Sequence, residues 1–368
     1  MEKIKKNFGF GCMRLPMIGE EVNCDEFCRM IDAFMESGFN YFDTAHGYLD
    51  GNSETALREC LVKRYPRESY ILTNKLSGGY FSKQEDILPL FNEQLTCCGV
   101  EYFDFYLMHA QNKQGFEKYK ACKAYETVLE LKEAGLVRHM GISFHDKAEV
   151  LDQILTEYPQ IEIVQIQFNY ADYDDASVES RKCYEVCRKH NKPMIVMEPV
   201  KGGKLVDLPN EAQAIFDSLN GGSAASYAIR YAAGFDGIIM VLSGMGTMEM
   251  VQDNCSYMKD FKPLNDTEKH AVAQVLDILR GFDLINCTAC SYCTAGCPKN
   301  IAIPNLFGCY NTNMMWGGSN GKYYYKHIYT SEGRKASDCI ECGQCEDVCP
   351  QHLPIKQLLK DVAAKFED

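Results

Sequence analysis

Residues 103–143 read FDFYLMHAQNKQGFEKYKACKAYETVLELKEAGLVRHMGIS. Two apolar runs, at 103–109 and 137–143, flank a stretch at 118–135 in which apolar residues recur at helical spacing. This stretch ends in Gly135, a residue typical of the end of a helix. A strand, a helix and a second strand in this order form a βαβ unit with parallel strands. The segment therefore predicts a parallel sheet that is covered by helices.

The same alternation runs from Phe8 to about Met258. Including the short FGFG segment near the start, it gives eight apolar runs separated by amphipathic stretches, which is the strand count of a (β/α)₈ barrel. A doubly wound sheet is the alternative, but no run leads into the G-x-G-x-x-G turn of that fold. The other seven runs are FNYFD (39–43), YILTNK (70–75), FDFYLMH (103–109), VRHMGIS (137–143), IEIVQIQF (161–168), PMIVME (193–198) and GIIMVLS (237–243).

Composition and charge narrow the classes of partner. The chain has 368 residues, of which 46% are hydrophobic and 24% charged, as in ordinary globular proteins. Its net charge of −13 argues against nucleic acid or an anionic membrane as a partner. No window approaches the ~18 apolar residues of a membrane span. The basic start at 1–16 has no apolar segment behind it, so we expect a cytoplasmic protein rather than a secreted one.

Nineteen cysteines are the most unusual feature of the composition. In a long chain with no expected export signal, metal ligation explains them better than disulfides do. The composition shifts near Gly281, so we predict a barrel domain at 1–280 and a small domain at 281–368. The motif C-x₂-C-x₂-C-x₃-C-P occurs twice in the second of these, as Cys287, Cys290, Cys293 and Cys297, and as Cys339, Cys342, Cys345 and Cys349.

This motif is typical of [4Fe–4S] clusters. Three closely spaced thiolates bind three corners of one cubane, and the fourth cysteine binds the other cluster. We therefore expect Cys349 to complete the first site and Cys297 the second. Structural zinc is the alternative, but zinc does not require the third cysteine or the trailing Cys-Pro. The tail resembles the bacterial two-cluster ferredoxins, which implies a small α+β ferredoxin-like domain.

In a (β/α)₈ barrel the chemistry lies at the carboxyl ends of the strands. Three consecutive strands lead to polar residues there: Asp43 with Tyr48 just beyond it, then Lys75, then His109. A lysine ammonium beside a phenol lowers the pKa of the phenol from ~10, and the carboxylate of Asp43 would hold that ammonium. Tyr48 could then give a proton to a carbonyl oxygen that His109 polarises.

With these residues in place, the chain resembles the aldo-keto reductases from about Phe8 to Asn254. FDTAHGY (42–48), LTNK (72–75) and YLMH (106–109) are similar to the segments that carry that family's Asp, Tyr, Lys and His. The resemblance implies an oxidoreductase that reduces a carbonyl, or oxidises an alcohol, with NAD(P)H as the hydride donor.

The resemblance also implies cofactor-binding residues. Ser143 and Gln165 match the positions that hold the nicotinamide carboxamide, whereas Phe144 replaces an asparagine and Met197 an aromatic residue. Lys201 and Lys204 are candidate phosphate partners, and in the loop at 243–254 Gly244 and Met250 stand where basic residues are expected. The full set is Met13, Arg14, Ser143, Gln165, Met197, Pro199, Lys201, Gly202, Ser243, Gly244, Gly246, Thr247 and Asn254.

Two other functions remain open at this point. A flavin such as FMN at the barrel mouth would connect one-electron clusters to two-electron chemistry, since a hydride moves both electrons together. A barrel retained as a scaffold or channel subunit is the non-enzyme alternative, which the complete set of four catalytic residue types disfavours. We expect the iron–sulfur domain to serve electron transfer or the docking of a redox partner, in an oxygen-poor cell.

Overall fold

The computed structural model describes residues 3–175, 178–219, 221–316, 320–330 and 333–367. Contacts within the chain separate it into two compact units. The first comprises residues 1–199 and 225–265, and the second comprises residues 200–224 and 266–368. The segment at 200–224 thus packs with the cysteine-rich part of the chain, although it lies between two strands of the barrel in sequence. The boundary near residue 280 stays a prediction.

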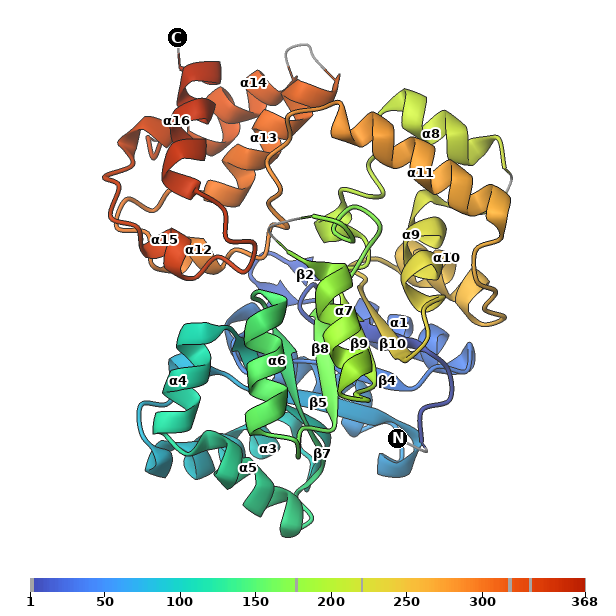
Figure 1. Ribbon diagram of the computed structural model, residues 1–368, viewed down its shortest axis with the longest axis vertical. Helices are drawn as coiled ribbons and strands as arrows, with labels where there is room; N and C mark the ends of the chain where they lie inside the picture. Colours follow the sequence, from blue (N-terminus) through green and yellow to red (C-terminus); the bar gives the residue numbers. More distant parts are fainter. Residues whose placement is uncertain (1–2, 176–177, 220, 317–319, 331–332, 368) are drawn as a thin grey trace. The chain divides into compact units, whose positions relative to one another are not determined.

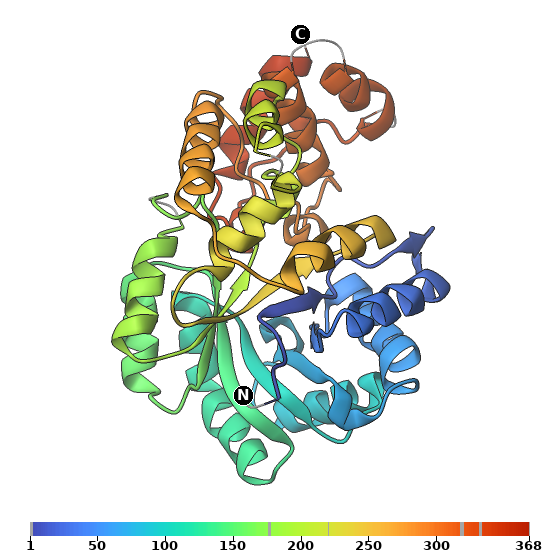
Figure 2. The ribbon, with the colours of Figure 1, turned by 90° about the vertical axis from the view of Figure 1, so that its right-hand side faces the viewer.

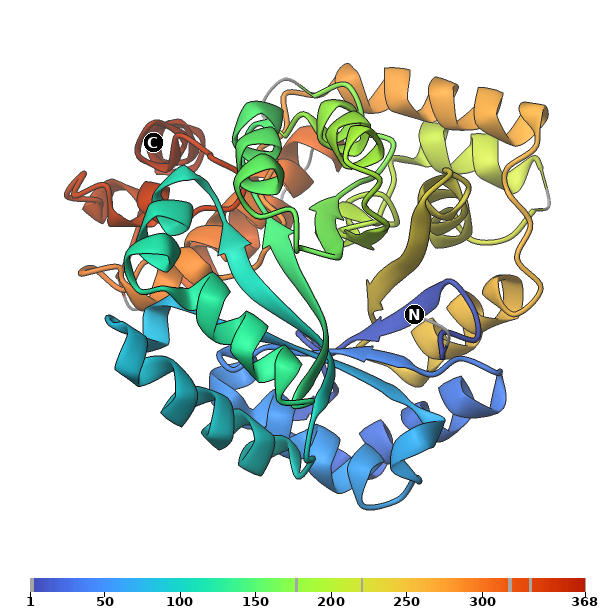
Figure 3. The ribbon, with the colours of Figure 1, turned by 60° about the horizontal axis from the view of Figure 1, so that its bottom comes forward.

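Eight parallel strands close into a barrel in the first unit (Figures 1 and 3). The order around the barrel is β1-β10-β9-β8-β7-β6-β5-β4, so that the first strand closes the sheet between the last one and β4. The (β/α)₈ prediction is confirmed, and each of the eight apolar runs overlaps one strand. These strands are β1 (Phe8–Gly11), β4 (Tyr41–Asp43), β5 (Ile71–Leu76), β6 (Phe103–Gln111), β7 (Val137–Phe144), β8 (Ile163–Gln167), β9 (Met194–Met197) and β10 (Ile238–Gly244).

Large apolar side chains fill the barrel interior. Gly141 on β7 leaves room for them, because a Cβ at this position would lie 2.5 Å from Ile163 Cγ2 and 2.6 Å from Leu107 Cδ2. Tight packing of this kind makes the barrel a rigid support for the strand ends. The interior group consists of Tyr41, Ile71, Phe105, Leu107, Ile163, Ile195, Met240 and Leu242.

Helices cover the outside of the barrel (Figure 2). A short antiparallel hairpin of β2 (Met17–Ile18) and β3 (Glu21–Val22) follows β1, and the sequence pattern did not predict it. Within the described ranges no helix is long and apolar enough to cross a membrane. The helices of the first unit are α1 (Cys24–Glu36), α2 (Asn52–Leu57), α3 (Ile87–Cys98), α4 (Lys113–Ala121), α5 (Ala124–Glu133), α6 (Ala148–Glu157), α7 (Ser180–Lys189), α9 (Ala224–Ala233) and α10 (Met248–Met258).

The second unit is built from helices and loops. The two cysteine motifs fold alike: a short helix begins five residues after the first cysteine, and a longer helix begins six residues after the fourth. In the part of the tail that the structure describes, the backbone forms helices and turns and no strand. Left-handed residues occur in both cysteine loops. Its helices are α8 (Asn210–Asp217), α11 (Asp266–Arg280), α12 (Tyr292–Ala295), α13 (Ile303–Trp316), α14 (Asn320–Tyr324), α15 (Gln344–Asp347) and α16 (Ile355–Phe366).

Candidate active site and cluster sites

Lys75 is the centre of the polar group at the carboxyl ends of β4, β5 and β6. Its Nζ lies 2.6 Å from Asp43 Oδ1 and 3.2 Å from Tyr48 Oη, and it donates to the carbonyl of Thr44 at 2.8 Å. Only 1% of Lys75 and 3% of Asp43 is exposed. A buried ammonium needs partners on every side, and these three oxygens supply them.

The backbone after β4 brings the phenol of Tyr48 to this lysine. Asp43 ends β4 and is paired in register with Thr73 of β5, so the two strands present their ends together. Beyond Tyr48, Leu49 and Asp50 both take left-handed backbone angles, with φ of 52° and 54°. Such angles are costly for residues other than glycine, and they are common where a site requires a particular side-chain position.

Burial raises the pKa of Asp43, while Lys75 and Gln165 oppose that rise. Gln165 donates to Asp43 Oδ2 at 3.3 Å, so both carboxylate oxygens have a donor. Two donors on one buried carboxylate favour its charged form. Asp43 is therefore held between an ammonium and an amide, and it fixes the position of Lys75.

His109 lies beside Tyr48, with the ring centroids 5.9 Å apart and the rings nearly perpendicular. Burial lowers the pKa of His109 well below its ordinary value, and the charges of Lys75 and His145 lower it further. The imidazole is therefore neutral near pH 7. Its Nδ1 lies 2.7 Å from the hydroxyl of Ser77, a residue that the sequence pattern did not single out. When this hydroxyl donates to Nδ1, the proton of the imidazole is on Nε2.

A buried polar network lies behind Lys75. Glu54 on α2 is fully buried and accepts from Asn74 Nδ2 at 2.7 Å and from Gln94 Nε2 at 3.3 Å. Its other oxygen lies 2.9 Å from Nδ1 of His46, in the loop that leads to Tyr48. Gln94 also donates to the carbonyl of Lys75 at 3.0 Å. The motifs in the sequence did not indicate this network, although a glutamate on the buried side of an amphipathic helix is a signal for it.

The two residues predicted to hold a nicotinamide lie in neighbouring strands. Ser143 of β7 and Gln165 of β8 are register partners, and both are almost fully buried. Ser143 Oγ accepts from the amide of Ala110 at 2.8 Å, next to His109. Both side chains therefore lie in the same polar layer as Asp43 and Lys75.

The predicted phosphate-binding loop follows β10. Asn254 on α10 donates to Ser243 Oγ at 3.1 Å, and Thr247 Oγ1 caps the start of α10 by accepting from the amide of Met250. Arg14 passes beside Gly244, since a Cβ at this glycine would lie 3.8 Å from its Nη1. Four other predicted residues lie at or beyond strand ends: Met13 follows β1, Met197 ends β9, and Pro199 and Gly246 lie in the loops beyond β9 and β10. Lys201 and Gly202 fold with the second unit instead.

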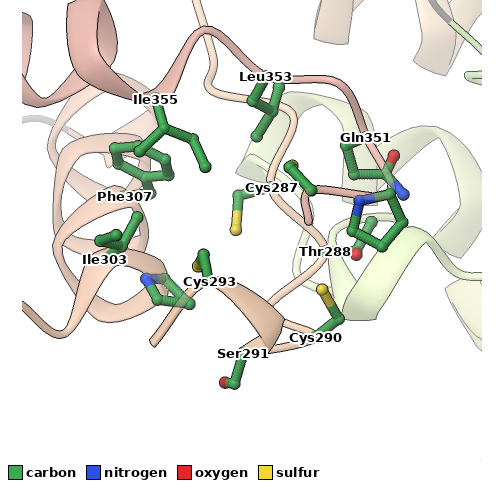
Figure 4. A pocket seen from close by; sticks show the side chains of 13 residues that line it. Cys287, Thr288, Cys290, Ser291, Cys293, Ile303, Phe307, Gln351, Leu353 and Ile355 are labelled. Carbon is green, nitrogen blue, oxygen red and sulfur yellow. The ribbon is translucent and has the colours of Figure 1, made fainter. Parts of the chain in front are cut away.

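A pocket in the second unit is lined by the four cysteines that the sequence assigns to the first cluster. Cys287, Cys290, Cys293 and Cys349 surround about 320 Å³ of space, counting the part that is open to solvent. Figure 4 shows the sulfur atoms of the first three facing this space. Burial, together with the neighbouring thiols of Cys290, Cys287 and Cys349, raises the pKa of Cys293 to about 12. Four thiolates this close together require a cationic partner, which the iron–sulfide core of a cluster would provide before the charges of its thiolates are counted.

The backbone of both cysteine loops favours an anionic cluster with bridging sulfides. Left-handed residues occur two and four positions after the first cysteine of each motif: Ala289 and Ser291 in one, Glu341 and Gly343 in the other. Turns of this kind direct successive backbone N–H groups to one point, as in many iron–sulfur sites. The amide of Ala289 is already directed at the sulfur of Cys287, 3.4 Å away.

The second site is built in the same way. Burial, the charge of Glu346 and the thiols of Cys339 and Cys342 raise the pKa of Cys345 to about 11. The three cysteines of this motif therefore lie close together. Gly296, next to Cys297, lies against Gln344 of this motif. Among the residues described, no three His, Cys, Asp or Glu side chains are arranged to hold one metal ion. A cubane does not need such a group, because each of its irons binds a single thiolate.

The fold and the buried lysine define a (β/α)₈-barrel protein that could transfer a proton through a phenol, joined to an iron–sulfur unit. Residues 7–277 match the model of the aldo/keto reductase family, and residues 286–353 match the 4Fe-4S dicluster domain. The chain belongs to the aldo/keto reductase family and carries a 4Fe-4S domain at its C-terminal end. Both resemblances that the sequence motifs indicated are thus confirmed.

Individual relatives are distant. An NADH-specific methylglyoxal reductase of Escherichia coli (strain K12) is 26% identical over 195 residues, which cover 48% of this chain and 57% of that protein. An uncharacterized oxidoreductase of Bacillus subtilis (strain 168) is 27% identical over 211 residues, covering 55% of this chain and 63% of the relative. The chain therefore spans about three fifths of the length of these curated relatives.

Solved structures show the same barrel. An aldo-keto reductase from Klebsiella pneumoniae in complex with NADPH superposes with a TM-score of 0.61 at 17% identity, over 73% of this chain and 90% of the other. The holo form of an aldo-keto reductase from Bacillus halodurans gives 0.60 at 22% identity, over 73% and 91%. At these identities the likeness concerns the fold.

Proposed function

We propose that the barrel reduces a small carbonyl compound to an alcohol, or catalyses the reverse reaction, with NAD(P)H. One observation carries the proposal: the ammonium of Lys75 lies between the carboxylate of Asp43 and the phenol of Tyr48 in a buried position. Family membership and the NADPH complex of a structural neighbour support the choice of cofactor.

NAD(P)H, when bound, supplies a hydride to the carbonyl carbon. Tyr48 gives its phenolic proton to the carbonyl oxygen, so that the product is a neutral alcohol. Lys75 stabilises the phenolate that remains, and Asp43 keeps Lys75 in position. His109 donates from Nε2 to the same oxygen, provided that Ser77 donates to Nδ1.

The residues that would hold the cofactor lie at the carboxyl ends of β7, β8 and β10. Ser143 and Gln165 offer polar groups for the carboxamide of the nicotinamide. Arg14 and the N-terminus of α10 at Thr247 offer a cation and backbone donors for a phosphate. These contacts favour neither NADH nor NADPH.

The two cysteine sites support two [4Fe–4S] clusters that transfer single electrons or dock a redox partner. Cys287, Cys290, Cys293 and Cys349 would hold the first cluster, and Cys297, Cys339, Cys342 and Cys345 the second. The clusters would exchange electrons with the barrel site only if a flavin were bound there, because a nicotinamide accepts both electrons together.

A spectrophotometric assay under anaerobic conditions tests the barrel proposal. The full chain is supplied with NADH or NADPH and a panel of small aldehydes and ketones, with methylglyoxal included because a relative reduces it. We expect nucleotide oxidation that depends on the carbonyl compound and is matched by alcohol formation. Alcohol formation that requires added flavin instead would support the flavin alternative, and no turnover on any member of the panel would contradict the proposal.

A further inference from the structure

The segment Val200–Leu205, with the sequence VKGGKL, touches the loop that begins the first cysteine motif. Gly202 has a φ of +64°, and a Cβ there would lie 2.4 Å from the carbonyl oxygen of Thr288 and 2.8 Å from its Cα. Thr288 lies between Cys287 and Cys290 and is 2% exposed. Only glycine allows two backbones to approach this closely.

A second contact fixes the residue at which this loop starts. The carbonyl of Ile285, two residues before Cys287, accepts from Lys204 Nζ, from Asn311 Nδ2 at 2.8 Å and from the amide of Cys287 at 2.9 Å. The amide of Ile285 donates back to Asn311 at 2.8 Å, and Ile285 is 4% exposed. Three donors on one buried carbonyl make this the anchor of the loop.

We propose that Gly202 and Lys204 are part of the binding site of the first cluster. Gly202 supports Thr288 and thereby sets the spacing of Cys287 and Cys290, while Lys204 anchors Ile285 and adds a positive charge beside the loop. The inference rests on the proposed assignment of the first cluster to Cys287, Cys290, Cys293 and Cys349. The resemblance to the aldo-keto reductases implied that this segment binds the nucleotide. Its contacts with Ile285 and Thr288 indicate instead that it supports the cluster site.

The charge of Lys204 has a predictable effect on the cluster. A cubane bound by four thiolates is anionic, and reduction adds one more negative charge. A nearby ammonium therefore stabilises the reduced cluster more than the oxidised one and raises its potential, because net charge and hydrogen bonds near the sulfurs set that potential. Lys204 is a positioning and tuning residue in this sense, not a ligand.

The location of the segment in the chain makes the contact important. Strand β9 ends at Met197, and Lys201 follows four residues later. The part of the chain that leaves this barrel strand thus packs against the loop that carries Cys287 and Cys290.

Two adjacent glycines provide a matched pair of variants. Gly202 and Gly203 both have positive φ, +64° and +97°, but a Cβ at Gly203 meets nothing within 4 Å. Alanine at either position pays a backbone cost, and only Gly202→Ala pushes on Thr288. In the full chain, reconstituted anaerobically, we expect about eight irons for the wild type and for Gly203→Ala, but about four for Gly202→Ala. Equal iron content in the two variants would overturn the inference.

Lys204 provides a second test if Gly202→Ala does not fold. We expect Lys204→Met to lower the midpoint potential of the first cluster in an EPR-monitored redox titration, Lys204→Arg to restore it, and the second cluster to stay unchanged. An unchanged potential in Lys204→Met would contradict the tuning role.

Cys290→Ala and Cys342→Ala assign the two EPR signals. If Cys290→Ala keeps both clusters, the proposed ligand assignment fails. If Cys290→Ala loses one cluster while the variants of Gly202 and Lys204 behave as the wild type, the ligand assignment stands and only the role of Gly202 and Lys204 is contradicted.

Discussion

The ammonium of Lys75 lies 2.6 Å from the carboxylate of Asp43, and both side chains are almost entirely buried. A buried ion pair contributes little net stability, since the desolvation of both charges offsets their attraction. The pair is therefore better explained by what Lys75 does for the adjacent phenol of Tyr48, 3.2 Å away. This relationship leads to a first prediction.

Tyr48→Phe should lower kcat for carbonyl reduction by about 10²- to 10⁴-fold, the usual contribution of a positioned general acid. The binding of NAD(P)H should change little, because the phenylalanine keeps the ring and removes only the hydroxyl. Steady-state kinetics and a fluorescence titration of the nucleotide would separate the two effects. Tyr323→Phe, at a tyrosine that is 55% exposed in the second unit, is the control. If Tyr48→Phe retained most of the wild-type rate, Tyr48 would not be the proton donor.

A second prediction concerns Ser77, which lies 2.7 Å from His109 Nδ1. Ser77→Ala removes the donor that keeps the proton of the imidazole on Nε2. The hydrogen bond should be worth about 1 kcal/mol, or roughly fivefold in kcat, with KM affected less. Ser77→Thr keeps the hydroxyl and should recover part of the rate. ¹⁵N NMR of labelled histidine would report the tautomer directly, and an unchanged tautomer in Ser77→Ala would contradict this role.

The sequence was sufficient for the barrel because the strands lie in short apolar runs that alternate with amphipathic stretches. It was also sufficient to propose Asp43, Tyr48 and Lys75, since residues at neighbouring strand ends must meet. It was not sufficient for Ser77 and Gln94, whose partners come from distant segments.

Helix breaks were also beyond the sequence pattern. The stretch at 118–135 looks like one helix, yet α4 ends at Ala121 and α5 begins at Ala124. Lys123 between them is left-handed, with a φ of 50°. Next to it, Cys122 directs its thiol at the carbonyl of Ser82. Such long-range contacts decide where a helix stops, and apolar periodicity does not contain them.

A third prediction follows from the lowered pKa of His109. At a pH below 6.5, the ordinary pKa of histidine, the side chain of His109 binds a proton in the unfolded chain but not in the folded protein. Folding stability should therefore fall as the pH drops from 6.5, by at most about 1.4 kcal/mol per pH unit from this group. Denaturant titrations between pH 5 and 8 would show a shallower decline for His109→Gln than for the wild type. Parallel curves for the two proteins would contradict the prediction.

Glu54 and Glu59 form a matched pair for a fourth prediction. Glu54 is fully buried and accepts from Asn74 and Gln94, whereas Glu59 is 41% exposed and pairs with Lys63. Glu54→Ala removes the only oxygen that accepts from Asn74 Nδ2 among the described contacts, and a buried donor that loses its acceptor costs about 1–3 kcal/mol. Glu59→Ala should cost much less, because an exposed ion pair contributes little net stability. Thermal unfolding of both variants measures the difference, and equal shifts in Tm would show that the buried network is not a structural support.

The last prediction separates a nicotinamide enzyme from a flavin-bridged one. Each [4Fe–4S] cluster carries one electron, whereas a hydride carries two, so the clusters can reduce a carbonyl compound only through a group that accepts electrons singly. With NAD(P)H as the barrel cofactor, dithionite-reduced clusters should stay reduced when the carbonyl substrate is added. NAD(P)H should support full turnover in the same protein, and Cys290→Ala, which removes the first cluster, should keep that turnover. Reoxidation of the clusters by the substrate, followed by EPR and by alcohol formation, would instead require a flavin bridge and would make the iron–sulfur unit the electron source.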